Sequence, residues 1–241
     1  MDAVDQAKID LVTALRWAHR CGLGEGICNH FSVAVPGSED RFLLNPQGLQ
    51  WAEVAVSDLL VVDGGGAVVE GQHQAEATAF FIHAAIHHTS ADAACVLHTH
   101  MPYATVICCL QGEKLEWLHQ NSTRFYGRVA YVESFNGLAL EDGEGTRLAR
   151  EFDDARVLFL ANHGVIVIGP DVATAFDDLY YLERACMVQV LARSTGSPLR
   201  LIPVATCQRT ADQFEEIRRQ SHLHLESARR VLLREEPDAF I

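Results

Sequence analysis

Two histidines, His98 and His100, lie one residue apart at the end of an apolar run, in VLHTHMPYATV (residues 96–106). In an extended strand, side chains two residues apart point to the same face, about 6.6 Å from one another. Two imidazoles in this arrangement can converge on one metal ion with bonds of about 2.0–2.1 Å. Alternatively, both rings end the strand and hydrogen-bond to backbone or water, and the pair alone does not decide between the two.

A third histidine, His163, has apolar segments on both sides, VLFLAN before it and VIVIG shortly after it. A polar ring held between two buried strands needs a partner, which is either a hydrogen bond in the core or a metal ion. Gly164 follows it and permits a tight turn. A third histidine at the same sheet end as His98 and His100 favours the metal, because three histidines with one open position are typical of a catalytic zinc site.

The fourth candidate is Glu76, at the start of a helix in GQHQAEA. One interpretation is capping, because a carboxylate in the first turn complements the helix dipole. The other is a carboxylate held over the metal as acid, base or fourth ligand. His83 and His87 lie at i, i+4 on the same helix and could also bind metal, but we expect them on a solvated helix face.

The elements that must position these residues alternate between strands and helices, which predicts an α/β fold with helices flanking a sheet. Helical periodicity marks the first 22 residues, the segment from Gln74 to residue 88, and the C-terminal part of the chain. Short apolar or alternating runs mark the strands. The expected strands lie in residues 26–37, 41–48, 59–71 (a hairpin), 94–98, 128–132 and 157–169 (two strands joined at 162–164), and the later helices in 102–110, 140–152, 171–194 and 211–235.

Composition limits the class of protein. The chain has 241 residues, 49% of them hydrophobic, and is predicted to form one domain over residues 1–241 with a helical extension from about 196. The net charge of −13 and the lack of a lysine/arginine run argue against a nucleic-acid partner. No apolar stretch is long enough to span a membrane, and the N-terminus does not resemble a signal peptide, so we expect a cytoplasmic protein. Seven cysteines without a C-x-x-C pair fit a reducing compartment.

Five segments together resemble the class II aldolase/adducin family over about residues 5–195: GLGEGICNHFSV, FLLNPQG, GQHQAEATAFFIHAAIH, ACVLHTHMPYAT and VLFLANHGVIVIG. The resemblance implies a three-layer αβα fold with a central, mostly antiparallel sheet, and a homotetramer with its metal site near a subunit interface. It implies that His98, His100 and His163 bind Zn²⁺, or another divalent ion such as Mn²⁺, Co²⁺ or Fe²⁺, and that Glu76 is the acid/base residue. Tyr103, Tyr126 and Tyr131 are the candidates for a tyrosine that reaches a neighbouring subunit's site.

The chain departs from the sugar-phosphate members of this family at the residues that hold phosphate. Gln74-Ala75 stands where those members have two serines, and Asn29-His30 where they have a glycine-asparagine pair. A phosphate dianion therefore loses donors suited to it. His30 could still bind an anion if protonated, and Gln74, with the backbone amides around Gln47-Gly48, could hold a carboxylate or hydroxyl group.

These features predict a divalent-metal-dependent lyase that cleaves a carbon–carbon bond of a small, unphosphorylated hydroxy-carbonyl or keto-acid substrate, as an aldolase does. Decarboxylation and epimerisation are the alternatives within the same family. A noncatalytic, adducin-like oligomeric scaffold is the alternative from another class; retention of all three histidines and Glu76 counts against it.

Overall fold

A computed structural model describes residues 2–88, 91–138 and 142–241. Within them, eight strands form one sheet in the order β4-β3-β2-β1-β5-β8-β7-β6. Neighbouring strands are antiparallel except for the parallel pair β6 and β7. The strands are β1 (His30–Ala34), β2 (Arg41–Leu44), β3 (Leu60–Asp63), β4 (Val68–Glu70), β5 (Cys95–Thr99), β6 (Val129–Val132), β7 (Val157–Leu160) and β8 (Gly164–Gly169).

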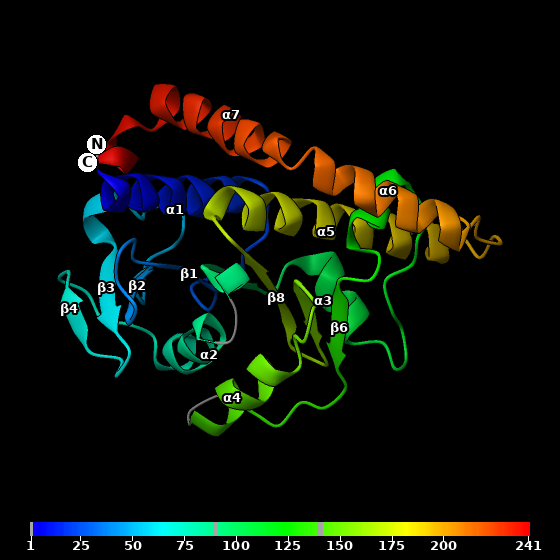
Figure 1. The fold of residues 1–241 in the computed structure, drawn as a ribbon, viewed down its shortest axis with the longest axis horizontal. Coiled ribbons are helices and arrows are strands. Elements are labelled where there is room, and N and C mark those ends of the chain that lie inside the picture. The colour runs from blue at the N-terminus through cyan, green and yellow to red at the C-terminus, as the bar shows by residue number, and fades with distance from the viewer. Residues whose placement is uncertain (1, 89–90, 139–141) are drawn as a thin grey trace.

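Helices cover both faces of the sheet (Figure 1). The core on one face is made with α1 (Ala3–Arg20), α3 (Pro102–Cys108) and α5 (Val172–Ser194). The core on the other face is made with α2 (Ala77–His87) and α4 (Asp142–Arg150). The three-layer αβα fold with a mostly antiparallel sheet is therefore confirmed. The short 3₁₀ helices are η1 (Val56–Asp58), η2 (Ala91–Ala93), η3 (Gln120–Phe125) and η4 (Pro237–Phe240).

The C-terminal part differs from the prediction of one helical segment over 211–235. It forms two helices, α6 (Val204–Glu216) and α7 (Arg219–Glu235). Helix α6 begins directly after Pro203, before the expected start at residue 211. Pro203 is its N-cap, a position where a proline costs no hydrogen bond. Helix α7 packs on α1 and α5, outside the three layers (Figure 1). No helix within the described ranges has the length and apolar character needed to cross a membrane.

Strand alternation decides which layer each candidate residue faces. Along β1 and β5, Phe31, Val33 and Leu97 belong to the core beneath α1 and α5. The intervening residues point to the face that α2 covers, because successive strand side chains alternate between faces. Since β1 and β5 pair with His30 opposite His98, both imidazoles lie on the α2 face.

Candidate metal centre

The three predicted histidines come together at one end of the sheet. His98 lies in β5, His100 immediately follows that strand, and His163 lies in the turn between β7 and β8. One ligand nitrogen from each ring can be chosen so that all three lie within 4.8 Å of one another. Nε2 of His98 and Nε2 of His100 are 3.2 Å apart. Two nitrogens on one tetrahedral zinc ion stand about 3.3 Å apart, so the spacing fits a shared ion.

Hydrogen bonds on the far side of two rings leave their Nε2 lone pairs facing the centre. Nδ1–H of His98 donates to the carbonyl oxygen of Val165, at 3.0 Å. Nδ1–H of His100 donates to a carboxylate oxygen of Glu25, at 2.7 Å. Such outer partners fix the tautomer and orientation of histidine ligands in metalloproteins. Sequence reasoning missed Glu25, because it lies 75 residues before His100 and no local spacing connects the two.

The turn that holds His163 does not use its glycine as predicted. Asn162 is the residue in the left-handed region, with φ of 56°. A Cβ on Gly164 would lie 2.6 Å from the carbonyl oxygen of Thr99 and 2.8 Å from Cδ2 of His100. Gly164 is therefore required because it lets β8 approach His100 closely, whereas asparagine supplies the tight turn.

Burial favours the neutral, metal-binding form of His98 and His163. It lowers the pKa of His98 well below the ordinary value for histidine. Burial, and then the neighbouring His100, lower the pKa of His163 to about 4. Neutral imidazole is the form that coordinates divalent ions such as zinc. The donor set therefore fits the divalent ion that the sequence predicted.

Glu76 lies near His30, whose ring neighbours that of His98. It is the N-cap residue of α2, and its Oε2 accepts a hydrogen bond from the Ala79 amide at 2.7 Å. The same oxygen is 3.9 Å from Nε2 of His30, whose ring centroid is 4.8 Å from that of His98. Among the described residues the candidate ligand group consists of the three histidines, without Glu76. Capping is therefore observed, and the acid/base role of Glu76 stays a prediction.

The surroundings of two predicted substrate contacts differ from what the sequence suggested. His30 is buried, and burial, followed by His100 and His163, lowers its pKa to about 3, which disfavours a protonated His30 that binds an anion. The Gln47 amide donates to the Gln74 carbonyl at 2.9 Å and is not available to a ligand carboxylate. The side chains of Gln47 and Gln74 are exposed, and Gly48 has φ of 88°. Their role in substrate binding stays a prediction.

His83 and His87 do not lie on a solvated helix face. The His83 side chain is only 2% exposed, and its Nε2 is 2.8 Å from Nδ1 of His30. The His87 ring stacks on Phe42 with centroids 4.4 Å apart. The sequence contained a signal that was missed, because Ala79, Ile82, His83 and Ile86 follow the i, i+3, i+4, i+7 spacing of a buried face.

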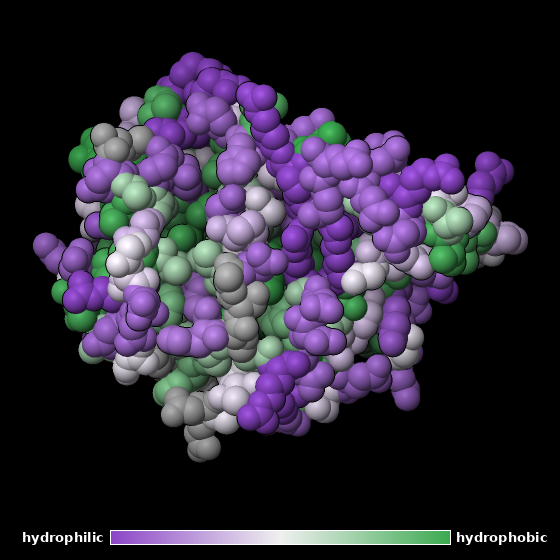
Figure 2. All heavy atoms as spheres, viewed as in Figure 1, coloured by the Kyte–Doolittle hydropathy of each residue, from purple (hydrophilic) through white to green (hydrophobic). Residues whose placement is uncertain are grey.

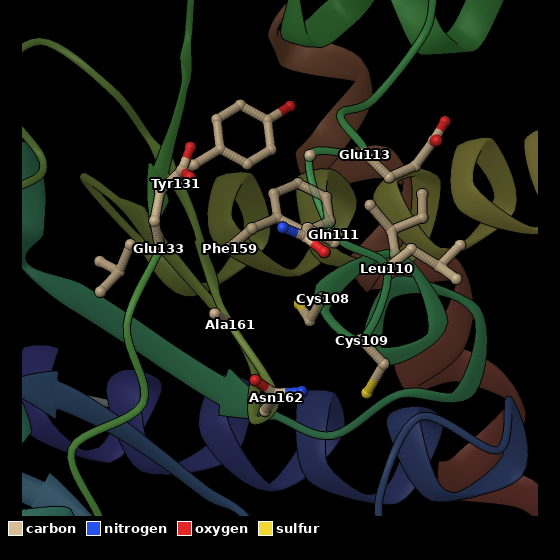
Figure 3. A pocket seen from close by; sticks show the side chains of 13 residues that line it. Cys108, Cys109, Leu110, Gln111, Glu113, Tyr131, Glu133, Phe159, Ala161 and Asn162 are labelled. Carbon is tan, nitrogen blue, oxygen red and sulfur yellow. The ribbon is translucent and has the colours of Figure 1, made fainter.

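A cavity of about 400 Å³ opens beside His100 and is lined also by Glu25, Thr105 and Cys109. A second cavity, of about 420 Å³, shares Cys109 with the first but is lined by none of the three histidines. In Figure 3, Asn162 lies at one end of this second cavity, with Tyr131 and Glu113 toward the other. Of these two cavities, the one beside His100 is lined by a candidate metal ligand. Tyr131 is held within its own chain, where its hydroxyl accepts from the Leu115 amide at 2.9 Å.

Comparison with known proteins identifies the family. Residues 9–190 match the class II aldolase and adducin N-terminal domain, and the chain belongs to that family. A class 2 aldolase-type protein of Pseudomonas aeruginosa is 35% identical over 82% of this chain and 76% of its own length. The decarboxylase NovR of Streptomyces niveus is 32% identical over 83% of this chain and 74% of its own length.

Solved structures show the same fold. An aldolase II superfamily protein from Pseudomonas syringae superposes with a TM-score of 0.90 at 31% identity, covering 99% of this chain and 96% of that one. An L-fuculose 1-phosphate aldolase from Glaciozyma antarctica PI12 superposes with a TM-score of 0.88 at 25% identity, covering 98% and 92%.

Proposed function

We propose that this protein is a divalent-metal-dependent lyase that cleaves a carbon–carbon bond of a small hydroxy-carbonyl or keto-acid substrate. The observation that carries the proposal is the convergence of His98, His100 and His163, with two Nε2 atoms 3.2 Å apart. These residues would hold Zn²⁺, or Mn²⁺, Co²⁺ or Fe²⁺, since imidazole suits all of them. The ion, when bound, supplies a Lewis acid for the negative charge that develops on the substrate oxygen as the bond breaks.

Glu76 is proposed to move the proton. Its place at the N-cap of α2 fixes the carboxylate through the Ala79 amide, so little reorganisation is needed before proton transfer. A carboxylate positioned in this way contributes about 10²- to 10⁴-fold to the rate as a general acid or base. The similarity to a fuculose-phosphate aldolase supports an aldol cleavage.

The substrate is proposed to be unphosphorylated. Gln74-Ala75 offers no hydroxyl pair to a phosphate group, and His30 is neutral, so the region lacks the charged or hydroxyl donors that a phosphate dianion needs. Loss of two such hydrogen bonds, at about 1.5–3 kcal/mol each, weakens phosphate binding by one to several orders of magnitude. Fuculose 1-phosphate should therefore be a poor substrate.

Decarboxylation of a metal-chelating acid is the second candidate, because the similarity to NovR, a decarboxylase, favours it. Loss of carbon dioxide leaves the same enediolate-type charge as aldol cleavage, so one site can serve either reaction. Epimerisation has no comparable support. A noncatalytic scaffold, as the adducin branch would suggest, does not require the converging histidines and the carboxylate of Glu76.

Elemental analysis of the purified protein tests the metal, and a substrate panel tests the reaction. We expect about one divalent ion per chain, a sharp loss in His163→Ala, and no loss in His222→Ala, whose ring is exposed on α7. Hydroxy acids and keto acids are then assayed for release of an aldehyde and for release of carbon dioxide. A phosphorylated sugar is assayed in parallel for comparison. A metal-free protein without either activity would favour the scaffold.

We also propose that the chain assembles as a homotetramer, as the resemblance to its family implies. Figure 2 shows hydrophobic side chains at the end of the molecule where α5 passes into α6. Leu191, Leu201 and Val204 are 51%, 56% and 65% exposed in this region. Exposed apolar residues grouped in this way are common at protein interfaces.

A further inference from the structure

Four buried or half-buried side chains from β1 and α2 form a continuous chain of hydrogen bonds that ends beside the candidate metal centre. Nδ1 of His30 is 2.8 Å from Nε2 of His83. Nδ1 of His83 is 2.6 Å from Oγ of Ser32. The same Oγ is 2.6 Å from Nε2 of His87, and Nδ1 of His87 is 2.6 Å from the carbonyl oxygen of Ala93.

The carbonyl at the far end fixes the first proton of this chain. A carbonyl oxygen can only accept, so Nδ1 of His87 carries a proton and donates it to Ala93. Burial lowers the pKa of His87 to about 4, so the ring is neutral and its Nε2 carries a lone pair. That lone pair accepts the single proton of the Ser32 hydroxyl group.

The remaining protons follow in order. Because the Ser32 hydroxyl has given its proton to His87, it can only accept from Nδ1–H of His83. A neutral His83 then has a lone pair on Nε2, which accepts from Nδ1–H of His30. Nδ1 of His30 therefore carries a proton, and in the neutral ring Nε2 carries the lone pair.

The charged group beside Nε2 of His30 is itself a hydrogen-bond acceptor, the carboxylate of Glu76. Nε2 of His30 is 3.9 Å from Oε2 of Glu76, beyond hydrogen-bond distance. An anionic oxygen placed next to Nε2 of His30 would meet a lone pair and no proton. A hydroxyl group placed there would donate to it, and the metal centre lies close by, since the rings of His30 and His98 are 4.8 Å apart.

We propose that the chain from the Ala93 carbonyl through His87, Ser32 and His83 fixes His30 as a hydrogen-bond acceptor, and that His30 selects substrates that present a hydroxyl proton donor to its Nε2. His83, Ser32 and His87 are then positioning residues, because they act through His30. The substrate part rests on the proposed function, whereas the tautomer of His30 does not.

The tautomer is measured by long-range ¹H–¹⁵N correlation on histidine-labelled full-length protein, with and without zinc, and the His30 signals are assigned by their loss in His30→Asn. We expect Nε2 of His30 at the shift of an unprotonated nitrogen and Nδ1 at that of a protonated one. Ser32→Ala should give a mixture of both tautomers, and Ser32→Thr, which keeps the hydroxyl group, should restore one. Ser221→Ala is the matched control, because it removes a buried serine hydroxyl bonded to Asp177.

A protonated Nε2 in the wild-type protein would overturn the assignment even if Ser32→Ala failed to fold. Unchanged His30 signals in a folded Ser32→Ala protein would show that the chain does not set the tautomer. If the tautomer is as expected but the protein binds no zinc, the proposed function fails and the hydrogen-bond chain stands.

Glycolate and methoxyacetate, with zinc-loaded protein, test the substrate part. Both offer a carboxylate and an α-oxygen, but only glycolate has a proton to donate. We expect glycolate to bind about tenfold more tightly to the wild-type protein, and this ratio to shrink in Ser32→Ala. Equal affinities of the wild-type protein for the two ligands would overturn the selection by His30. A ratio that Ser32→Ala leaves unchanged would overturn it too, because the extra methyl group alone would then cause the difference.

Discussion

Glu25 influences the candidate metal centre through His100. Its carboxylate holds Nδ1–H of His100 and thereby points Nε2 toward the other ligands. Glu25→Gln keeps the size of the side chain but removes the charge, so we expect the dissociation constant for zinc to rise by about 10- to 100-fold. Chelator competition measures it, with the exposed Glu39→Gln as control. Equal zinc affinity in Glu25→Gln and the wild-type protein would show that Glu25 is dispensable.

At the residue scale, the capping of α2 by Glu76 can be separated from its proposed acid/base role. Glu76→Gln keeps an oxygen that can accept from the Ala79 amide but removes the basic carboxylate. We expect kcat to fall by about 10²- to 10⁴-fold, with metal content and Tm nearly unchanged. Glu76→Ala loses the cap as well, which costs about 0.5–2 kcal/mol of stability. A Glu76→Gln enzyme that kept its kcat would restrict this residue to capping.

At the scale of elements, α2 couples the candidate base to the hydrogen-bond chain. Its N-cap is Glu76, and its buried face carries His83 and His87 against Ser32 of β1. A rigid shift of this helix would therefore move the carboxylate and the partners of His30 together. The helix positions both because it packs directly on the strands that carry His30 and His98.

Asp177 connects α5 to η3 and α7. It accepts from Arg124 at 2.7 Å, from Ser221 at 3.1 Å and from His224 at 2.8 Å. Burial by itself would raise the pKa of Asp177, but the hydrogen bond from His224 and the charge of Arg124 outweigh it, so the pKa lies below its usual value. Because the folded pKa lies below the unfolded one, the carboxylate stabilises the fold above the unfolded value and this contribution is lost as the pH falls through the folded value.

We expect Asp177→Asn to lower the free energy of unfolding by about 3–5 kcal/mol at neutral pH, since it leaves the Arg124 charge buried without its partner. The difference from wild type should shrink as the pH falls below about 4, near the unfolded pKa of aspartate. Urea unfolding from pH 7 to pH 3 measures both, with exposed Asp212→Asn on α6 as control. A difference that stayed constant down to pH 3 would contradict this assignment.

At the scale of the whole molecule, the proposed homotetramer has a simple consequence. Light scattering coupled to size exclusion should give about four times the 26.6 kDa mass of the chain. Leu201→Glu and Val204→Glu on the exposed apolar end should lower that mass if this end lies in an interface. A monomeric mass for the wild-type protein would contradict the assembly and leave the metal prediction intact, because its candidate ligands all come from one chain.

The sequence by itself determined most of the elements and the candidate ligand set. Strand and helix periodicities located β5, α2 and the β7–β8 turn, because these patterns arise from local backbone geometry. The two-residue spacing of His98 and His100 made their convergence predictable, because a strand alternates side chains with a period of two. The buried segments around His163 likewise indicated a ring that needs a partner.

Only the tertiary structure decided the surroundings of the candidate metal ligands. Glu25 reaches His100 across 75 residues of sequence, and His83 reaches His30 across 53. These contacts depend on which strands pair and on which face of α2 packs against them, and neither is a local property of the chain. The contact of Gln47 could not be predicted either, because its backbone amide donates to the Gln74 carbonyl in a loop contact that no sequence spacing reveals. Desolvation, which lowers the pKa of His30 to about 3, likewise exists only once the layers close around the ring.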